Sequence, residues 1–508
     1  MVAVWACFLA RLLFYSSMLP LWEGYDEWAH FAVVRQMAFG GRLLVARDAP
    51  IPRDVEASLQ LAPVPWELRS LPPPAVTRDQ YWTLNRDERE RRESALRTMP
   101  AAWGRDDGSG PLRAYEALQP PLYYWLMVPV LWVFRGFSLL AQVLALRFLS
   151  SLVGSLAVPL VFLIGRELWG DSRFALGSAA IVALMPGLAY DVARVGNDCL
   201  AVVLFTLLTW LVVRSARAPA IGLVLGCGLL TKAYFLTAIP WTWWGKRFRL
   251  PAICLSALLA GWWYVRNLRT TGTLSGLSES LMLRGVSVGE LVRKSAEIDW
   301  WKAIDAIFLS HLYFGGWSSL TVRSWMYHVF YLVILAAAVG LARAFRQPAV
   351  RTLLAVYLCF WLGQLYNVVI LYASKGLAGS MGWYMYAVVG AEAALAIAGL
   401  RCLLPERAWR WIPAAGAAMF ALLDLYTVHA VAIPYYTGMI RHRANGSLEA
   451  LHGAGLRSVG VGGAAERLAQ LVPPALLVTL WLMYLMGTAG ALACANGRKC
   501  DSATKSQA

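Results

Sequence analysis

Long apolar runs alternate with short polar segments along most of the chain. The runs occupy residues 2–21, 141–165, 174–190, 198–213, 250–265, 325–342, 351–372, 383–401, 411–430 and 472–494. About 20 apolar residues in a helix span the hydrocarbon core of a bilayer, so each run predicts one membrane crossing. The pattern therefore predicts an all-α polytopic membrane protein.

Two further regions leave the number of crossings open. Residues 120–134 are apolar but, at about 15 residues, are short for a crossing and suited to a helix at the membrane interface. Residues 222–244 have Lys232 at their centre. They form either one crossing or two short ones in a hairpin.

The distribution of basic residues favours one topology, because cytoplasmic loops collect Lys and Arg. If 120–134 does not cross and 222–244 crosses twice, the basic clusters fall inside: Arg166, Arg173, Arg214, Arg217, Lys246, Arg247, Arg249, Arg343, Arg346, Arg407, Arg410, Arg498 and Lys499. This arrangement predicts about twelve transmembrane helices with both termini inside. The outer loops are then 22–140, 266–324 and 431–471, and the first carries juxtamembrane helices.

Composition agrees with a membrane protein and excludes other classes. Apolar residues make up 59% of the 508 residues and charged residues only 15%, which excludes a soluble globular domain. The net charge of +16 does not indicate a nucleic-acid partner, because the basic residues are mostly Arg at the ends of apolar runs, where they suit membrane lipids. The eight cysteines show no C-x-x-C spacing, so neither a disulfide framework nor a zinc site is indicated.

The first apolar run contains Arg11 at its middle. The run lacks a basic leader and a small-residue cleavage site, so it is interpreted as a retained span rather than a signal peptide. An Arg in mid-membrane costs about 3 kcal/mol and requires a carboxylate, carbonyl or water partner. Arg11 therefore either faces the protein interior or lies before a later true start codon.

Two polar motifs stand at the edges of apolar runs. The first is Gly24-Tyr25-Asp26-Glu27-Trp28-Ala29-His30-Phe31, where the first run ends. A carboxylate in this partly dry environment becomes more basic and can take a proton from a hydroxyl, but the motif also fits an interfacial cap with aromatic belt residues. The second is Tyr115-Glu116-Ala117-Leu118-Gln119-Pro120-Pro121-Leu122-Tyr123-Tyr124-Trp125, in which the double Pro predicts a helix start.

At these motifs the chain resembles the GT-C superfamily of polytopic glycosyltransferases. The resemblance is strongest to a bacterial membrane-protein family of unknown function, and more distant to protein O-mannosyltransferases and lipid A aminoarabinose transferases. The matching elements are Asp26-Glu27 with His30, Gln119-Pro120-Pro121-Leu122-Tyr123-Tyr124, Arg194-Val195-Gly196-Asn197-Asp198, Leu230-Thr231-Lys232 and Trp263-Tyr264-Val265-Arg266-Asn267. Downstream, Trp383 stands where a Gly-Arg-Tyr element of the unknown-function family has Arg.

The resemblance implies inverting transfer of a sugar from a polyprenyl-phosphate donor to an acceptor hydroxyl. The acceptor would be a glycan, a lipid or a protein, and the site would face the extracytoplasmic side of the plasma (inner) membrane. Asp26 is the expected base, and Glu27 or Asp198 would orient the acceptor or tune that base. Cations would stabilise the departing lipid phosphate. The expected substrate-binding residues are His30, Gln119, Tyr123, Arg194, Asn197, Lys232 and Arg266.

The same residues also have purely structural interpretations. Lys232 could snorkel, Arg266 could anchor a membrane end, and Asp198 could cap a helix. Two other classes of function remain open: a transporter or flippase of lipid-linked sugar, and a scaffold that kept the fold without activity. No metal signature is present, although a divalent cation could be held by the acids at 26, 27 and 198.

The expected organisation follows from the resemblance and the topology. Residues 1–270 form a GT-C-like catalytic membrane module that includes outer loop 22–140. Residues 271–324 form an extracytoplasmic loop, 325–430 the C-terminal transmembrane helices, 431–471 a further extracytoplasmic segment, and 472–508 the last transmembrane helix with a cytoplasmic tail.

Overall fold

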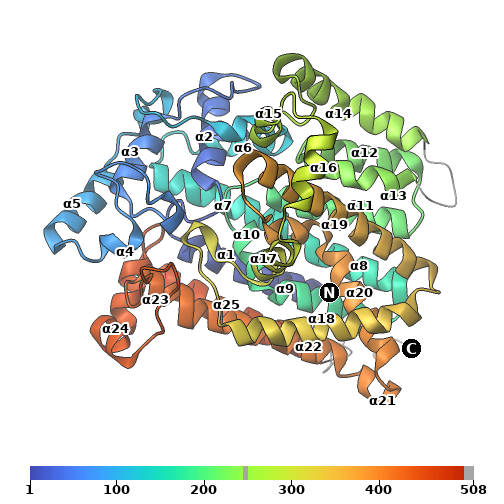
Figure 1. Cartoon of the computed structure of the whole chain (residues 1–508). Coiled ribbons are helices and arrows are strands. Elements are labelled where there is room, and N and C mark those ends of the chain that lie inside the picture. The colour runs from blue at the N-terminus through green and yellow to red at the C-terminus, as the bar shows by residue number, and fades with distance from the viewer. Residues whose placement is uncertain (244–249, 497–508) are drawn as a thin grey trace.

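The computed structural model describes residues 1–243 and 250–496, and within them the protein is helical (Figure 1). Extended backbone pairs only in isolated bridges in these residues, for example Pro50 with Arg113. The all-α fold expected from the apolar pattern is therefore confirmed.

Six helical segments of the described chain are long and apolar enough to cross a membrane. They are α7–α8 (Leu139–Trp169), α18 (Ser324–Ala344), α19 (Pro348–Lys375), η6–α20 (Gly382–Leu403), the α21–α23 segment (Glu406–Tyr436) and α25 (Pro474–Ala495). A seventh is possible if α9 (Ser172–Leu184) and α10 (Pro186–Val192), bent by 65° at their junction, count as one span. Residues 1–243 and 250–496 thus form a multi-pass membrane protein.

The remaining apolar helices are shorter. They are α1 (Val2–Met18), α6 (Leu122–Val133), α11 (Asp198–Val213) and α12 (Ala218–Leu229). At 1.5 Å per residue, a helix as short as α12 reaches about 18 Å, well below the bilayer core of about 30 Å. The count of twelve crossings therefore stays a prediction. The basic residues 246, 247, 249, 498 and 499 that supported it lie outside the described residues.

The Lys232 region is a broken helix. After α12 the chain turns at residues 230–232 and continues as η4 (Ala233–Ala238) and α13 (Ile239–Trp243). Helix α14 (Leu250–Thr271) packs against α12, where a Cβ on Gly222 would lie 2.7 Å from the Ala252 carbonyl oxygen. The lack of a side chain at Gly222 thus permits close packing of the two helices.

The first polar stretch folds into short helices. They are α2 (Glu27–Gly40), α3 (Arg53–Leu61), η1 (Trp66–Leu68), α4 (Arg78–Tyr81), α5 (Arg86–Arg97), η2 (Ala101–Arg105) and η3 (Tyr115–Leu118). The mixed-charge run forms α5, whose first turn is capped by Asn85. Solvent-exposed pairs such as Arg86–Glu90 (2.6 Å) line it, which suits alternating charges on a solvated helix.

The later polar segments contain α15 (Ser278–Met282), α16 (Val288–Ala296), α17 (Trp300–Leu312), η5 (Gly316–Ser318) and α24 (Gly453–Leu468). In Figure 1 the C-terminal α23 (Ile433–Tyr436) and α24 lie beside α4 and α5. The indole of Trp82 donates to the Tyr436 carbonyl (3.1 Å), and His442 bonds to Asp79 (2.9 Å). The first polar stretch and the C-terminal segment therefore pack against each other.

Arg11 has the interior partner that its position requires. Its guanidinium is fully buried and lies 2.8 Å from Asp424, in α22 (Ile412–Tyr426). Asp424 also accepts the hydroxyls of Tyr15 (2.5 Å) and Tyr484 (2.7 Å). This cluster joins α1, α22 and α25 and offsets the desolvation of Arg11 by a charged, hydrogen-bonded partner.

Candidate active site

Asp26 lies where the chain leaves α1 and enters α2. Its carboxylate is half-buried and accepts a short hydrogen bond from the Tyr115 hydroxyl (2.5 Å). Tyr115 belongs to η3, nearly ninety residues further along the chain. The two polar motifs identified in the sequence therefore meet at this carboxylate.

The backbone of Asp26 has a left-handed conformation, with φ 53° and ψ 17°. Such a conformation is uncommon for a residue with a Cβ and costs about 1–3 kcal/mol unless the surroundings enforce it. Here the Asp26 carbonyl accepts the first amide protons of α2, from Ala29 (3.0 Å) and His30 (2.9 Å). The turn therefore aims the carboxylate at η3.

Glu27, the next residue, is held by Arg147. The guanidinium of Arg147 binds both carboxylate oxygens of Glu27 (2.7 and 2.6 Å), and both side chains are fully buried. Its other protons go to the carbonyls of Ser16 (3.0 Å), Leu19 (2.5 Å) and Pro20 (2.8 Å) at the end of α1. The bidentate pair fixes the exit of α1 against the start of α2.

Arg194 and Lys232 supply the positive charge beside Asp26. Arg194 lies between α10 and α11 and binds Asp191 (2.8 Å), Asp198 (2.5 Å) and the Tyr25 carbonyl (2.8 Å). The ammonium of Lys232 binds the other carboxylate oxygen of Asp198. Asp198 therefore bridges the two cations, and both are buried.

The electrostatic environment of Asp26 combines opposing effects. Burial raises the pKa of Asp26 above its ordinary value of 3.8, and the charge of Asp198 acts in the same direction. The Tyr115 hydrogen bond and the charges of Arg194 and Lys232 lower it. The net result is a raised pKa, which makes Asp26 a stronger base than an exposed carboxylate.

His30 and Glu116 belong to the same polar cluster, because the charge of Asp26 acts on Glu116. The Nδ1 atom of His30 lies 2.9 Å from the Tyr124 hydroxyl and 3.6 Å from Glu116 Oε2. Burial, followed by the charges of Arg194 and Lys232, lowers the pKa of His30 well below its ordinary value. His30 is therefore a neutral imidazole at neutral pH.

Tyr123 and Asn197 hold the loop that carries Arg194. The Tyr123 hydroxyl accepts the Gly196 amide proton (2.9 Å) and lies 3.1 Å from the Ser150 hydroxyl. The Asn197 side chain donates to the Thr231 carbonyl (3.1 Å), directly before Lys232. Gln119 ends η3, and its backbone N–H donates to the Glu116 carbonyl (3.0 Å). These residues connect the motifs to one another.

Arg266 is placed apart from these contacts. Its guanidinium lies over the Trp263 ring (5.0 Å to the centroid) and 3.4 Å from the Asn267 side-chain oxygen. Within residues 1–243 and 250–496 no ion pair joins it to Asp26 or Asp198. Of the cations expected at the site, the structure thus brings Arg194 and Lys232 to the acids.

Aromatic rings of η6 (Gly382–Val388) lie near both cations, directly in the case of Lys232 and through Tyr25 in the case of Arg194. Trp383 stacks on Tyr25 (3.8 Å, 10°), and the Arg194 guanidinium lies over the same Tyr25 ring (5.3 Å). Lys232 lies over the neighbouring Tyr384 (4.9 Å). Trp383 is buried in this stack, and Trp317 meets it edge-on (5.9 Å).

The described residues hold no cluster of three or more His, Cys, Asp or Glu side chains that could bind a metal. The acids at 26, 27 and 198 are engaged by Tyr115, by Arg147, and by Arg194 with Lys232, respectively. A metal-dependent role for these three acids therefore finds no support in their contacts.

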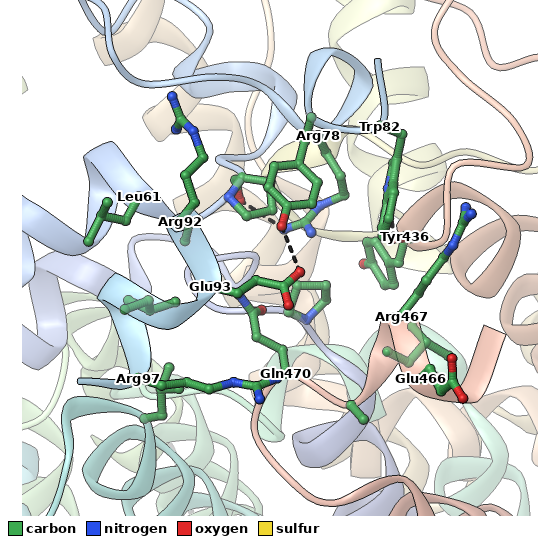
Figure 2. A pocket seen from close by; sticks show the side chains of 18 residues that line it. Leu61, Arg78, Trp82, Arg92, Glu93, Arg97, Tyr436, Glu466, Arg467 and Gln470 are labelled. Carbon is green, nitrogen blue, oxygen red and sulfur yellow. Dashed lines mark hydrogen bonds between the residues drawn. The ribbon is translucent and has the colours of Figure 1, made fainter. Parts of the chain in front are cut away.

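A separate pocket lies between α5 and the C-terminal α24 (Figure 2). Figure 2 shows Arg78, Arg92, Glu93 and Arg467 around it. The Tyr81 hydroxyl, which also lines the pocket, donates to Glu93 (2.8 Å). Arg78 is paired with Glu23 (3.3 Å) and Arg92 with Glu88 (2.6 Å). None of the residues predicted as catalytic or substrate-binding lines this pocket.

Several members of the cluster are not evident from the sequence. Tyr115 and Glu116 lie within the second motif, but no feature of their spacing distinguishes them from its other polar residues. Arg147 lies inside an apolar run, and an intramembrane Arg is itself a signal of a buried acidic partner. That signal could have identified the partner of Glu27.

No family model matches the chain, and no curated protein matches it. Among solved structures, ArnT from Cupriavidus metallidurans bound to undecaprenyl phosphate is similar over 98% of this chain and 78% of its own, with a TM-score of 0.48 and 15% identity. The same protein in the apo state covers 96% of this chain and 75% of its own, with a TM-score of 0.45 and 16% identity.

Proposed function

We propose that the protein is a glycosyltransferase that moves a sugar from a polyprenyl-phosphate donor to an acceptor hydroxyl, with inversion at the anomeric carbon, at the extracytoplasmic face of the membrane. One observation carries the proposal. A half-buried carboxylate of raised pKa, Asp26, is held in a left-handed turn beside two buried cations from distant segments, Arg194 and Lys232. The motif resemblance supplies the substrate class.

The reaction requires a base on one side of the sugar and positive charge on the other. Asp26 takes the proton from the acceptor hydroxyl as its oxygen bonds to the anomeric carbon. The bond from that carbon to the phosphate oxygen breaks, and the electron pair leaves with the lipid phosphate. Attack opposite to the leaving group inverts the configuration.

Lys232 and Arg194 are suited to stabilise the leaving phosphate. An ammonium has three protons, and Lys232 bonds to one carboxylate, Asp198. A phosphate oxygen can therefore be received by the remaining protons, while Arg194 adds charge without moving. Asp198 orients both cations in this proposal and is not the base.

The alternative of a transporter has one observation in its favour, the 65° bend between α9 and α10. Broken helices at mid-membrane are typical of transporters. Proteoliposomes containing labelled polyprenyl-phosphate sugar separate the two functions, because a transporter moves the lipid across the bilayer and forms no product.

The test of the proposed function is product formation by the purified full chain. Undecaprenyl-phosphate sugars, prepared as a panel of hexose, N-acetylhexosamine and pentose donors, are incubated with the protein and a lipid extract as acceptor. The proposal expects released undecaprenyl phosphate and a glycosylated product from at least one donor. Transbilayer movement of every donor without any product would favour the transporter.

The pH dependence of transfer should report the protonation of the Asp26 carboxylate. The base works only when unprotonated, so kcat/KM falls as the pH drops through the pKa of Asp26. Because burial raises this pKa, the acid limb should lie above the ordinary value of 3.8. A pH profile of kcat/KM measures the limb, and a limb at or below that value would contradict the assignment. Asp87→Asn, an exposed change on α5, should leave the profile in place.

Trp383 should act through Tyr25. Removing the stacked ring by Trp383→Ala frees Tyr25, whose carbonyl binds Arg194 and whose neighbour is Asp26. A lost aromatic pair of about 1 kcal/mol, together with the displaced base, predicts a fall in kcat of about tenfold. Trp383→Phe, which keeps a stacking ring, should stay within about threefold of the wild type. Equal rates for the Ala variant and the wild type would show that the stack has no positioning role.

A further inference from the structure

Glu116 differs from the other buried acidic residues that the structure describes. Each of the others binds a basic side chain within 3.3 Å: Glu23 with Arg78, Glu27 with Arg147, Asp54 with Arg35, Asp191 with Arg194, Asp198 with Lys232 and Arg194, and Asp424 with Arg11. These pairs offset the desolvation of each carboxylate. Glu116 is also buried, but no lysine or arginine side chain of the described residues forms an ion pair with it.

Residue Glu116 is 8% exposed, and its Oε2 atom has no hydrogen-bond partner among residues 1–243 and 250–496. The nearest nitrogen of a titratable side chain is His30 Nδ1 at 3.6 Å, which is beyond hydrogen-bond distance. A buried, unpaired carboxylate ion is strongly unfavourable, and such a group takes up a proton instead.

His30 cannot supply the missing charge. The Tyr124 hydroxyl donates its only proton to the Glu116 carbonyl (3.0 Å), so its oxygen must accept from His30 Nδ1 at 2.9 Å. The Nδ1 proton is therefore committed to Tyr124. With its pKa lowered by burial, His30 stays neutral and faces Glu116 without a positive charge.

The charges around Glu116 come from each element packed against it. Asp26 and Asp198 raise the pKa of Glu116, Lys232 and Arg194 lower it, and burial exceeds these effects and places the pKa well above its ordinary value. Asp26 instead has the Tyr115 hydroxyl as a hydrogen-bond donor. The Tyr115 hydroxyl favours the ionised form of Asp26, whereas the buried Oε2 of Glu116 has no such donor in the described residues, which favours the form that carries a proton.

We propose, on the basis of the proposed function, that Glu116 is a substrate-binding residue. Its carboxylic acid group carries its proton and forms a hydrogen bond with a hydroxyl group of the bound sugar or acceptor next to Asp26. An acid that retains its proton is both donor and acceptor, which matches a hydroxyl group. Glu116 binds the hydroxyl group without removing its proton, because Asp26 is the base.

Two variants and one control test this role. Glu116→Ala removes the bond, so KM should rise about tenfold with little change in kcat, as expected for a lost hydrogen bond of about 1.4 kcal/mol. The KM that rises identifies the source of the hydroxyl group, donor sugar or acceptor. Glu116→Gln keeps a neutral donor and acceptor, so KM should stay within about threefold and the acid limb of kcat/KM should not move. Glu90→Gln, an exposed change on α5, is the matched control.

The outcomes are distinct. An unchanged KM in Glu116→Ala would overturn the binding role. A large loss in Glu116→Gln, with the acid limb shifted to lower pH, would show a charged Glu116 and also overturn it. If the Ala variant fails to fold, the Gln profile alone decides. Difference infrared spectra of the wild type against Glu116→Gln should show a protonated carboxyl at neutral pH, and its absence would contradict the proposal even if no sugar transfer were found.

Discussion

Asp26→Asn should transfer sugar at least about 10²-fold more slowly than the wild type, because general-base catalysis contributes roughly 10² to 10⁴. Asn has nearly the same shape as Asp, and its amide oxygen can still accept the Tyr115 hydroxyl, but it cannot take a proton from the acceptor. The loss should therefore fall on kcat. Single-turnover transfer from an undecaprenyl-phosphate sugar measures it.

Binding and folding are the controls for this variant. The left-handed turn at residue 26 tolerates Asn at least as well as Asp, so thermal stability should stay within a few degrees of the wild type. Binding of undecaprenyl phosphate should also be retained, because Lys232 and Arg194 are unchanged. Transfer at the wild-type rate by the folded variant would remove Asp26 as the base.

Arg147→Met should destabilise the protein by about 3–5 kcal/mol, because it leaves Glu27 charged and fully buried without its cation. It also leaves the carbonyls of Ser16, Leu19 and Pro20 without their donor. Thermal unfolding of the protein in lipid nanodiscs measures the effect. This loss of stability is far larger than the loss expected when an arginine at the membrane end of a helix is replaced.

Arg166→Met provides that comparison. Arg166 is exposed and bonds only to Ser172 (2.6 Å) within the described residues, so its loss should change stability by less than about 1 kcal/mol. Combining Arg147→Met with Glu27→Gln should recover part of the loss, because the uncompensated charge is then removed. Equal stability of Arg147→Met and the wild type would show that the buried pair does not hold α1 against α2.

The motifs predicted a site that combines Asp26, Glu27 and Asp198 with Arg194, Lys232 and Arg266. In the structure ion pairs join Arg194, Asp198 and Lys232, and their charges act on Asp26, while the role of these residues in a site stays a prediction. Charged residues beside apolar runs have few environments open to them, because in the membrane they must pair or line a cavity. This constraint makes such residues more predictable than surface charges.

Other features depend on contacts that the sequence does not encode locally. Glu27 was expected to assist catalysis, yet its carboxylate is occupied by Arg147, 120 residues away. Arg266 was expected beside the acids, but its contacts are with Trp263 and Asn267 on its own helix. Helix lengths also differ from the apolar runs, since the run at 222–244 breaks at Lys232 into short helices. Tertiary packing decides these features.

The central claim is that Asp26, Lys232 and Arg194 act on one bound substrate. Its most direct test is a structure of the full chain with undecaprenyl phosphate bound, determined by electron cryo-microscopy in nanodiscs. The account predicts the phosphate within hydrogen-bond distance of the Lys232 ammonium, with a terminal phosphate oxygen, the one that carries the sugar in the donor, facing the Asp26 carboxylate. A phosphate bound instead in the pocket of Figure 2, or out of reach of both residues, would contradict it.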